Sequence, residues 1–163
     1  MTALTVRPAR PSDAEAMADL LNRIIAIGGT TAHEEPFSPA RILSDYIDGP
    51  HTLTCFAALD GDRLIGFQAT ERHPGLPEGW ADIGTFVLPG IQRGGIGSAL
   101  FAATRSATRS AGITTINATI RADNAPGLGY YARCGFSDYA HDPDFALNDG
   151  TRVGRISRRF DLV

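Results

Sequence analysis

A cluster of glycines between an expected strand and an expected helix is the feature that most constrains the fold of this chain. Residues 80–88 form a largely apolar stretch that stops at Pro89, which is typical of a strand. Glycine-rich residues 92–97 follow, then helical spacing to about residue 111, then the β-branched stretch 114–121. Because two strands joined by a helix are almost always parallel neighbours with a right-handed crossover, we expect this strand–helix–strand unit inside a larger sheet.

The rest of the chain alternates between strand and helix patterns, without an internal repeat or a low-complexity linker. We therefore expect an α/β protein, organised as a mixed α+β sheet with flanking helices, in a single domain over residues 1–163. Ser12 and Glu15 predict a capping box at the start of the first helix, and Gly28 predicts its end. Further helices are expected at 38–47 and 124–134, and further strands at 4–7, 52–59, 63–69, 136–140 and 152–161.

The composition excludes several classes of function. All 15 basic residues are arginine, so Schiff-base chemistry and lysine-dependent phosphate loops are excluded. The net charge of −3 disfavours nucleic acid as a partner. Cys55, Cys134 and the four histidines lack metal-ligand spacing, so we expect no metal, and two free thiols suit a reducing cytoplasm. The longest apolar run is too short to span a membrane and no signal peptide is visible, so we expect a cytoplasmic protein without a membrane partner.

The glycine-rich turn itself predicts a binding site for an anion, most often a phosphate. Glycines let a ligand approach the backbone, and the first N–H groups of a helix have no partner within it. A Walker loop is excluded because no lysine precedes Ser98, and a dinucleotide fingerprint is excluded because Leu100 occupies its third glycine position. A tight turn that binds nothing is the alternative.

Two motifs resemble the signatures of the GNAT superfamily of N-acetyltransferases. The first, Gln92-x-x-Gly95-x-Gly97, resembles the pyrophosphate-binding motif of that family. The second covers residues 124–136, where an asparagine opens a helix that carries a Tyr-Tyr pair and ends in Gly-Phe. The motifs stand in the family order, and the order of elements resembles the whole family fold. The resemblance implies a central, mostly antiparallel sheet with a parallel, splayed strand pair, and acetyl-CoA as the cosubstrate.

The resemblance also implies where acetyl-CoA would bind. The pyrophosphate would lie on the N–H groups of the turn, where Arg93 either adds charge or is a solvated turn arginine. The pantetheine arm would lie along Phe86 and Val87, with the Val87 N–H as oxyanion donor to the thioester. The acetyl-CoA-binding residues implied in this way are Phe86, Val87, Gln92, Arg93, Gly94, Gly95, Ile96, Gly97, Ser98, Asn124 and Tyr131.

Tyr131 occupies the position of the family's general acid, which would protonate the leaving thiolate of coenzyme A. A thiol has a pKa of about 8.5, so a modest acid suffices. A buried aromatic residue is the alternative interpretation of Tyr131, and packing is the interpretation that we favour for Tyr130. The acceptor ammonium must lose a proton before it attacks, for which Asp82 is the first candidate base, Glu71 the second and His73 the third. A surface strand acid is the alternative for Asp82.

The loop at residues 28–37 resembles, more loosely, the same loop of phosphinothricin and small amino-acid N-acetyltransferases. This implies that Thr30, Thr31 and Glu34 bind a small amine bearing a carboxylate, with Arg72 to pair that carboxylate; a solvated connector is the alternative. We therefore predict transfer of an acetyl group from acetyl-CoA to the primary amine of a small molecule, an amino acid or its analogue being one candidate. A protein or peptide N-acetyltransferase and a non-catalytic acyl-CoA-binding module are the alternatives. Exposed edge strands permit a homodimer.

Overall fold

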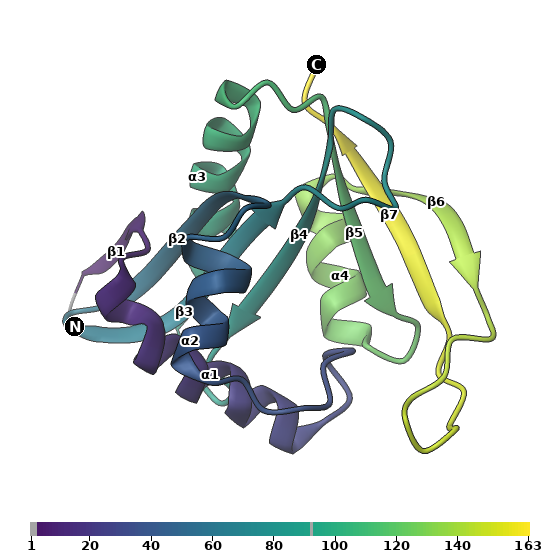
Figure 1. The fold of residues 1–163 in the computed structure, drawn as a ribbon, viewed down its shortest axis with the longest axis horizontal. Coiled ribbons are helices and arrows are strands. Elements are labelled where there is room, and N and C mark those ends of the chain that lie inside the picture. The colour runs from purple at the N-terminus through teal and green to yellow at the C-terminus, as the bar shows by residue number, and fades with distance from the viewer. Residues whose placement is uncertain (1–2, 92) are drawn as a thin grey trace.

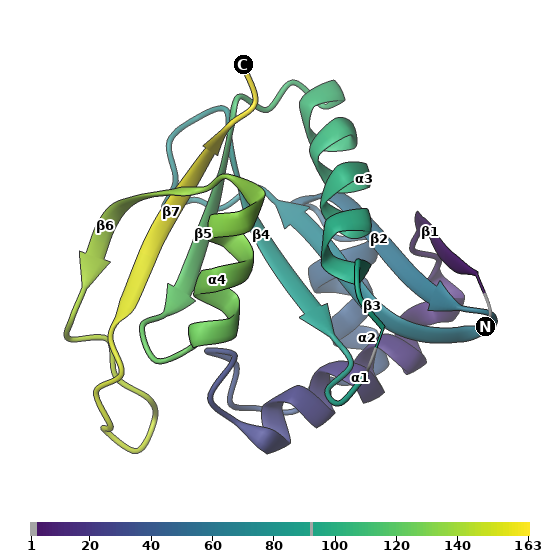
Figure 2. The same cartoon turned by 180° about the vertical axis from the view of Figure 1, so that it is seen from behind.

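The computed structural model describes residues 3–91 and 93–163, which form a mixed sheet with helices on both faces (Figures 1 and 2). Seven strands follow one another in the order β1-β2-β3-β4-β5-β7-β6. Among the described residues, the pair β4–β5 is parallel and the other pairs are antiparallel, which confirms the predicted fold class. The strands are β1 (Leu4–Pro8), β2 (Thr52–Asp60), β3 (Arg63–Glu71), β4 (Trp80–Val87), β5 (Thr115–Arg121), β6 (Ser137–Asp142) and β7 (Arg155–Asp161).

Within the described residues, two α-helices cover each face of the sheet. Figure 1 shows α1 (Ala14–Ile27) and α2 (Pro39–Ile42) on the near face, and α2 continues into one π-helical stretch, Leu43–Ile47. The opposite face, turned to the viewer in Figure 2, carries α3 (Ile96–Ser110) and α4 (Ala125–Cys134). In the part of the chain that is described, no helix has the length and apolar character needed to cross a membrane.

The start of α1 differs from the prediction. The capping box expected for Ser12 and Glu15 is wrong: the Asp13 carboxylate accepts the backbone N–H of Arg10 at 2.7 Å. The reason is that residues 11–13 form a short 3-10 turn opened by a proline, so α1 begins at Ala14. Asp13 also pairs with Arg7 at 2.8 Å, which fixes the turn against β1. The predicted end at Gly28 is confirmed, with a φ of 75° that favours glycine.

Strands β4 and β5 pair only at their first three residues. The parallel register joins Trp80 to Thr115, then continues to the pair formed by Asp82 and Asn117, and stops there. Beyond that point β4 stays paired with β3 as far as Val87, whereas β5 stays paired with β7 as far as Arg121. The two strands therefore diverge toward their carboxyl ends, which is the splay that the family resemblance implies; Figure 1 shows the gap between them.

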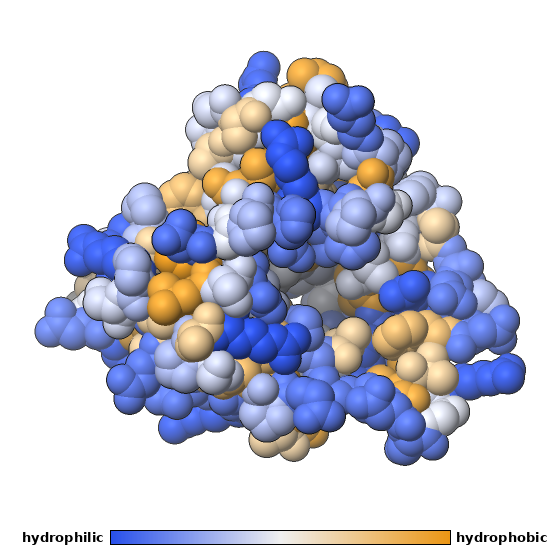
Figure 3. Space-filling view, viewed as in Figure 1, coloured by the Kyte–Doolittle hydropathy of each residue, from blue (hydrophilic) through white to orange (hydrophobic). Residues whose placement is uncertain are grey.

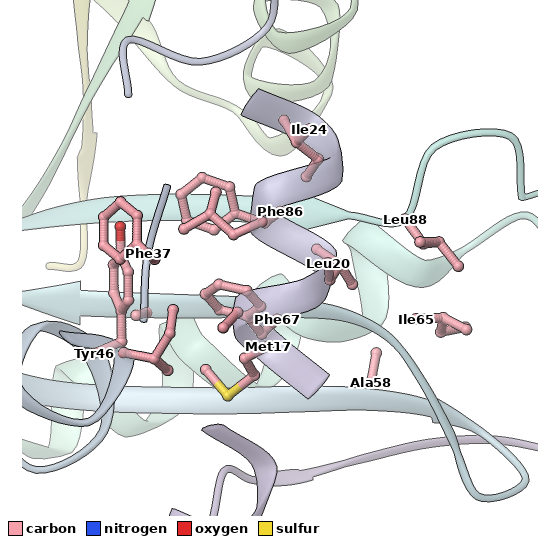
Figure 4. Close-up of a cluster of buried hydrophobic side chains, with 14 of the residues drawn as sticks. Met17, Leu20, Ile24, Phe37, Tyr46, Ala58, Ile65, Phe67, Phe86 and Leu88 are labelled. Carbon is pink, nitrogen blue, oxygen red and sulfur yellow. The ribbon is translucent and has the colours of Figure 1, made fainter. Parts of the chain in front are cut away.

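Each half of the divided sheet has its own hydrophobic core. One cluster packs α1, α2 and α3 against β2, β3 and the carboxyl end of β4; Figure 4 shows Phe67 and Phe86 at its centre, 4.9 Å apart between ring centroids. The other cluster packs α4 and one side of α3 against β5 and β7, with Phe101 and Phe136 in ring contact. The two cores lie on either side of the gap between β4 and β5, and the gap itself is left as a cavity.

Candidate active site

A cavity of about 680 Å³ opens between the diverging strands. It is lined by β4, β5, the start of α4 and the loop that joins α1 to α2, and Figure 3 shows this face of the molecule hollowed near its middle. Of the predicted catalytic residues, Tyr131, Asp82 and Glu71 all line this cavity. The sheet topology thus brings β4, which carries Asp82, and α4, which carries Tyr131, to the same cavity, although the two residues are about 50 positions apart in the chain.

The edge of β4 that faces the cavity presents backbone groups without strand partners. The Leu88 N–H donates to the Ile65 carbonyl at 2.8 Å, which makes these two residues a hydrogen-bonded pair. Hydrogen-bonded and non-hydrogen-bonded pairs alternate along antiparallel strands, so the N–H groups of Val87 and Thr85 point away from β3 and into the gap. The predicted pantetheine residues Phe86 and Val87 both line the cavity.

The glycine-rich turn leads from β4 into α3 and borders a second cavity of about 440 Å³. Gly95 precedes the helix with a φ of 81°, a conformation that other residues adopt at a cost. The same cavity is lined by Gly97 and Ser98 and by two arginines that the sequence analysis did not select, Arg105 of α3 and Arg133 of α4. Four N–H groups at a helix start and two arginines suit an anion.

Two of the predicted turn residues need separate comment. Arg93 forms an ion pair with Asp60, the last residue of β2, at 3.0 Å between Nη1 and Oδ1. Its charge is therefore shared with a carboxylate. Gln92, the first residue of the predicted motif, lies outside the described residues.

The Tyr131 side chain is buried on α4 and reaches the cavity with its hydroxyl group. Its ring packs against Phe136 at 5.1 Å, and its oxygen lies 2.8 Å from the Thr85 hydroxyl oxygen. Burial raises the pKa of Tyr131, the Thr85 hydrogen bond lowers it, and the charge of Asp82 raises it. A phenol in this setting stays protonated at neutral pH, so it is available to give a proton to a stronger base such as a thiolate.

Tyr130 does more than pack, which corrects the interpretation made from the sequence. Its hydroxyl donates to the Gly97 carbonyl at 2.8 Å and accepts from Gln68 Nε2 at 2.9 Å. The same Gln68 nitrogen donates to the Thr85 hydroxyl at 2.9 Å. A Cβ at position 97 would lie 2.5 Å from the Tyr130 ring, so the absence of a side chain there makes room for Tyr130. Gln68 is fully buried on β3 and gives no signal in the sequence, where it reads as one polar residue in a strand.

Two candidate bases face each other across β3 and β4. Asp82 and Glu71 are register partners at the closed end of the gap, where Asp82 forms the last pair between β4 and β5. Burial raises the pKa of Asp82, and a hydrogen bond from Asn117 at 2.7 Å lowers it. The pKa of Glu71 is raised by burial and then by the charges of Asp82 and Asp45. His73, the third candidate, accepts the Gly75 N–H at 3.0 Å and is not among the residues that line the cavity.

Comparison with known proteins decides the family. Residues 16–136 match the model of the acetyltransferase (GNAT) family. The chain belongs to this family. Its enzyme class is therefore the predicted one, an acetyl-CoA-dependent N-acetyltransferase.

Several relatives are acetyltransferases of small molecules by name. A phosphinothricin N-acetyltransferase from Streptomyces coelicolor is 28% identical, over 80% of this chain and 80% of the relative. An aminoglycoside N(6')-acetyltransferase type 1 from Stenotrophomonas maltophilia is 31% identical, over 84% of this chain and 88% of the relative. A mycothiol acetyltransferase from Actinosynnema mirum is 37% identical over 55% of this chain, and the match spans only 30% of that relative.

The fold has a close counterpart in a solved structure. A phosphinothricin acetyltransferase from Sinorhizobium meliloti, determined in complex with acetyl-CoA, superposes with a TM-score of 0.84 at 18% identity. The superposition covers 99% of this chain and 89% of the other. It supports the GNAT fold that the sequence motifs predict.

The α1–α2 loop of this acetyltransferase is tied across the gap by two side chains. The Arg121 guanidinium donates to the Thr31 carbonyl at 3.0 Å and holds Asp123 with two further hydrogen bonds. Asn124 donates to the Thr30 carbonyl at 3.0 Å while its own oxygen caps α4 by accepting the Gly127 N–H. Thr30 and Thr31 line the cavity, and their carbonyls are used to fix the loop.

The two remaining predicted acceptor residues of this acetyltransferase do not line the cavity. The Glu34 carboxylate accepts the Asn148 N–H at 3.0 and 3.1 Å, which places it against the β6–β7 loop. Arg72 is exposed beyond the end of β3, where its backbone N–H donates to the His51 carbonyl at 2.8 Å. The structure instead brings other side chains from the α1–α2 region to the cavity wall, among them Asp45.

His33 and Tyr46 also line this wall and were missed by the sequence analysis. They are hydrogen-bonded to each other at 3.0 Å. Burial lowers the pKa of His33, so its ring is neutral at neutral pH. We call this wall, with Asp45, Glu71 and Asp82, the acceptor end of the cavity, and we call the β4 edge with the glycine-rich turn the donor end.

Proposed function

We propose that this acetyltransferase transfers the acetyl group of acetyl-CoA to the primary amine of a small molecule, by direct attack and a tetrahedral intermediate. The observation that carries the proposal is the meeting of three groups at one cavity. They are the unpaired edge of β4 with the Val87 N–H facing the gap, the Tyr131 hydroxyl, and the carboxylates of Asp82 and Glu71. A hydrogen-bond donor to the thioester oxygen, a general acid and a general base are the groups that aminolysis of a thioester requires.

In this proposal the donor end holds acetyl-CoA. The pyrophosphate lies at the start of α3, on the N–H groups of residues 93–98, with the two arginines Arg105 and Arg133 beside it. The pantetheine arm follows the free edge of β4 as an added strand would, past Phe86 and Asn124. The thioester oxygen then accepts the Val87 N–H, which stabilises the charge that develops on that oxygen.

The chemical step balances with the groups at hand. The amine nitrogen attacks the carbonyl carbon, and the π electrons move to the oxygen. When the intermediate collapses, the C–S bond breaks and the sulfur takes the Tyr131 proton. Two protons leave the nitrogen in the course of the reaction. The first leaves the ammonium before attack and goes to Asp82 or Glu71, directly or through water. The second leaves the nitrogen of the tetrahedral intermediate and passes through water to the Tyr131 phenolate, so that the products are a neutral amide, a neutral thiol and a phenol. Raised carboxylate pKa values suit this task because they bring the pKa of the base closer to that of the amine.

Two acceptor classes have support. An amino acid or its analogue follows from the loop resemblance and from the relative named phosphinothricin N-acetyltransferase. A cationic amine such as an aminoglycoside is favoured by a different observation. Glu71 and Asp82 line one wall and form no ion pair among the described residues, whereas the lining arginines Arg121 and Arg155 are each paired with an acid. The relative named aminoglycoside N(6')-acetyltransferase agrees with this second class.

The first experiment is release of free coenzyme A thiol from acetyl-CoA across a panel of amines. The panel holds amino acids, phosphinothricin, methionine sulfone, polyamines, aminoglycosides, arylamines and short peptides. Saturable release with an amino acid analogue supports the first class, and release with polyamines or aminoglycosides supports the second. Release with peptides alone would replace the proposal with protein modification. If no amine is acetylated and calorimetry shows that acetyl-CoA binds, a non-catalytic module would replace it.

Four further features belong to the proposal. Residues 1–163 act as one acyl-CoA N-acyltransferase domain. The Cys55 and Cys134 thiols, which are free, suit a reducing cytoplasm. The catalytic step uses no metal, and a homodimer through an exposed sheet edge is compatible with the fold.

A further inference from the structure

A line of hydrogen bonds runs from the glycine-rich turn to the Tyr131 hydroxyl. It begins at the Gly97 carbonyl, passes through Tyr130 and Gln68, and ends with Thr85 and Tyr131. Gln68, at its centre, is fully buried, and each link measures between 2.8 and 2.9 Å. The line connects β3, β4, α3 and α4 across the donor end of the cavity.

The direction of most of these bonds follows from the atoms involved. An amide nitrogen carries two hydrogens and no free lone pair, so Gln68 Nε2 donates to both Thr85 and Tyr130. Tyr130 has one hydroxyl hydrogen, and the Gly97 carbonyl takes it. If the oxygen and nitrogen of the Gln68 amide were exchanged, its oxygen would have to accept the Tyr130 hydrogen that Gly97 already accepts. The exchanged orientation therefore does not fit. Within this line, only the hydrogen bond between the Thr85 and Tyr131 hydroxyls can run in either direction.

Two arrangements of that last bond are conceivable. If Tyr131 donated, the Thr85 hydrogen would be turned toward the cavity, which Thr85 also lines, and the phenol hydrogen would be held by Thr85 and away from the leaving sulfur. If Thr85 donates, its oxygen still accepts from Gln68, and the phenol hydrogen of Tyr131 is turned toward the cavity. The second arrangement is the one that general acid catalysis needs, because the Tyr131 proton then faces the cavity in which the leaving sulfur would lie.

We propose that Thr85, held by Gln68, is a positioning residue that directs the Tyr131 proton toward the leaving sulfur. The same Thr85 hydrogen then donates to the phenolate oxygen that the proton leaves behind, which stabilises the charged form of the acid. This inference rests on the proposed role of Tyr131 as general acid. It also assigns Gln68 and Tyr130 to one task, that of fixing the acid relative to the glycine-rich turn.

The test compares Thr85→Val with Thr85→Ser. Valine keeps the shape and removes the hydroxyl, whereas serine keeps the hydroxyl. Thiol release from acetyl-CoA is measured with the most active amine of the panel as the acceptor. A separate assay without amine measures the release caused by hydrolysis, in which water is the acceptor. We expect Thr85→Val to lower kcat by about tenfold or more while KM for acetyl-CoA changes by less than about threefold, and Thr85→Ser to recover most of kcat.

A double-variant cycle separates positioning from a purely structural effect. In the Tyr131→Phe background the phenol is gone, so Thr85→Val should change kcat by less than about twofold. If the fold alone were weakened, the loss caused by Thr85→Val would be the same in both backgrounds. Equal losses, or an unchanged kcat for the single Thr85→Val variant, would overturn the proposal.

Thr70 provides the matched control for these variants. It is a buried threonine on β3, two residues from Gln68, and its hydroxyl bonds to Thr54 at 2.7 Å and to Thr108 at 3.1 Å. It does not line the cavity. Thr70→Val should lower the melting temperature about as much as Thr85→Val and leave kcat within about twofold.

The outcomes also separate this inference from the proposed function. If Tyr131→Phe itself keeps full activity, the acid assignment fails and the inference fails with it. If Tyr131→Phe is impaired and Thr85→Val is not, the acid stands and only the positioning role is overturned.

Discussion

The donor end and the acceptor end of the cavity are built from different parts of the chain. The donor end consists mostly of backbone: the free edge of β4 and the first N–H groups of α3. The acceptor end consists of side chains from separate segments, with Asp45 after α2, Glu71 on β3 and Asp82 on β4. A backbone site is fixed once the fold is fixed, whereas a side-chain site can change with single substitutions. The donor is therefore common to a family and the acceptor is specific to a member.

The largest effect should come from Tyr131→Phe, because the acid serves whatever amine is bound. We expect kcat to fall by about 100-fold or more, which is the usual contribution of general acid catalysis. Binding of acetyl-CoA, measured by calorimetry, should stay within about threefold, since the ring and its contact with Phe136 are kept. Retention of full kcat would show that the thiolate leaves without help from this residue.

Asp82→Asn should act at the acceptor end, with a loss that depends on pH. We expect kcat/KM to fall by about 100-fold near pH 7, and the loss should shrink as the pH approaches the amine pKa of about 10. In the parent enzyme the carboxylate is active when ionised, so activity falls as the pH drops through its raised pKa. Asn117→Leu removes the donor that lowers this pKa, so the acid limb should move to higher pH.

Glu71→Gln is the comparison that identifies the base. If Asp82 is the base, Glu71→Gln keeps the acid limb near its original pH, because burial and the Asn117 hydrogen bond, rather than the charge of Glu71, set the pKa of Asp82. An acid limb that disappears in Glu71→Gln and persists in Asp82→Asn would assign the role to Glu71 instead.

Gly97→Ala should affect the donor end alone. The new methyl group would meet the Tyr130 ring at 2.5 Å, so the ring must leave its place between the turn and Gln68. We expect the dissociation constant of acetyl-CoA to rise by about tenfold, with an unchanged order of preference among amines. Gly94→Ala lies in the same turn and meets no atom within 4 Å, so its effect should be smaller. Equal effects of the two variants would mean that the contact with Tyr130 is unimportant.

Asn124→Ala should lower both stability and acceptor affinity. It removes a helix cap, worth about 1 kcal/mol, and the bond to the Thr30 carbonyl that holds the α1–α2 loop. Ser38→Ala removes the cap of α2 and no contact of the cavity, so it should show a similar loss in denaturant unfolding with an unchanged acceptor KM. If both variants keep the acceptor KM, the tie between the loop and α4 does not shape the acceptor end.

The smallest effects are expected for Arg72→Ala and Glu34→Gln. Both side chains lie away from the cavity wall, so the acceptor KM should stay within about twofold in steady-state assays. A rise of about tenfold would show that the loop closes over a bound acceptor and brings these residues to it.

The sequence predicted the donor end far better than the acceptor end, for a physical reason. Consecutive residues determine a strand, a glycine-rich turn and a helix start, so Gly95 and the parallel strand pair could be predicted. The point where β4 leaves β5 depends on packing of two separate cores, which no short motif records. Gln68 and Thr85 look like ordinary strand residues, and His33 comes near Tyr46 only through the path of the α1–α2 loop. Asp13 accepts the Arg10 N–H, which is the role expected of Glu15 in the predicted box, because the chain first forms a short 3-10 turn over residues 11–13.

The three-pair junction between β4 and β5 has a thermodynamic consequence. The two cores share one sheet, yet between these strands the ladder is unfinished. A ligand that completes the ladder binds the folded chain and not the unfolded one, so it adds to the free energy of unfolding by mass action. At 100 times its dissociation constant that addition is about 2.7 kcal/mol. The melting temperature of this protein is thus a property of the chain and its cosubstrate together, and it can report which acyl-CoA the gap accepts before any acceptor is known.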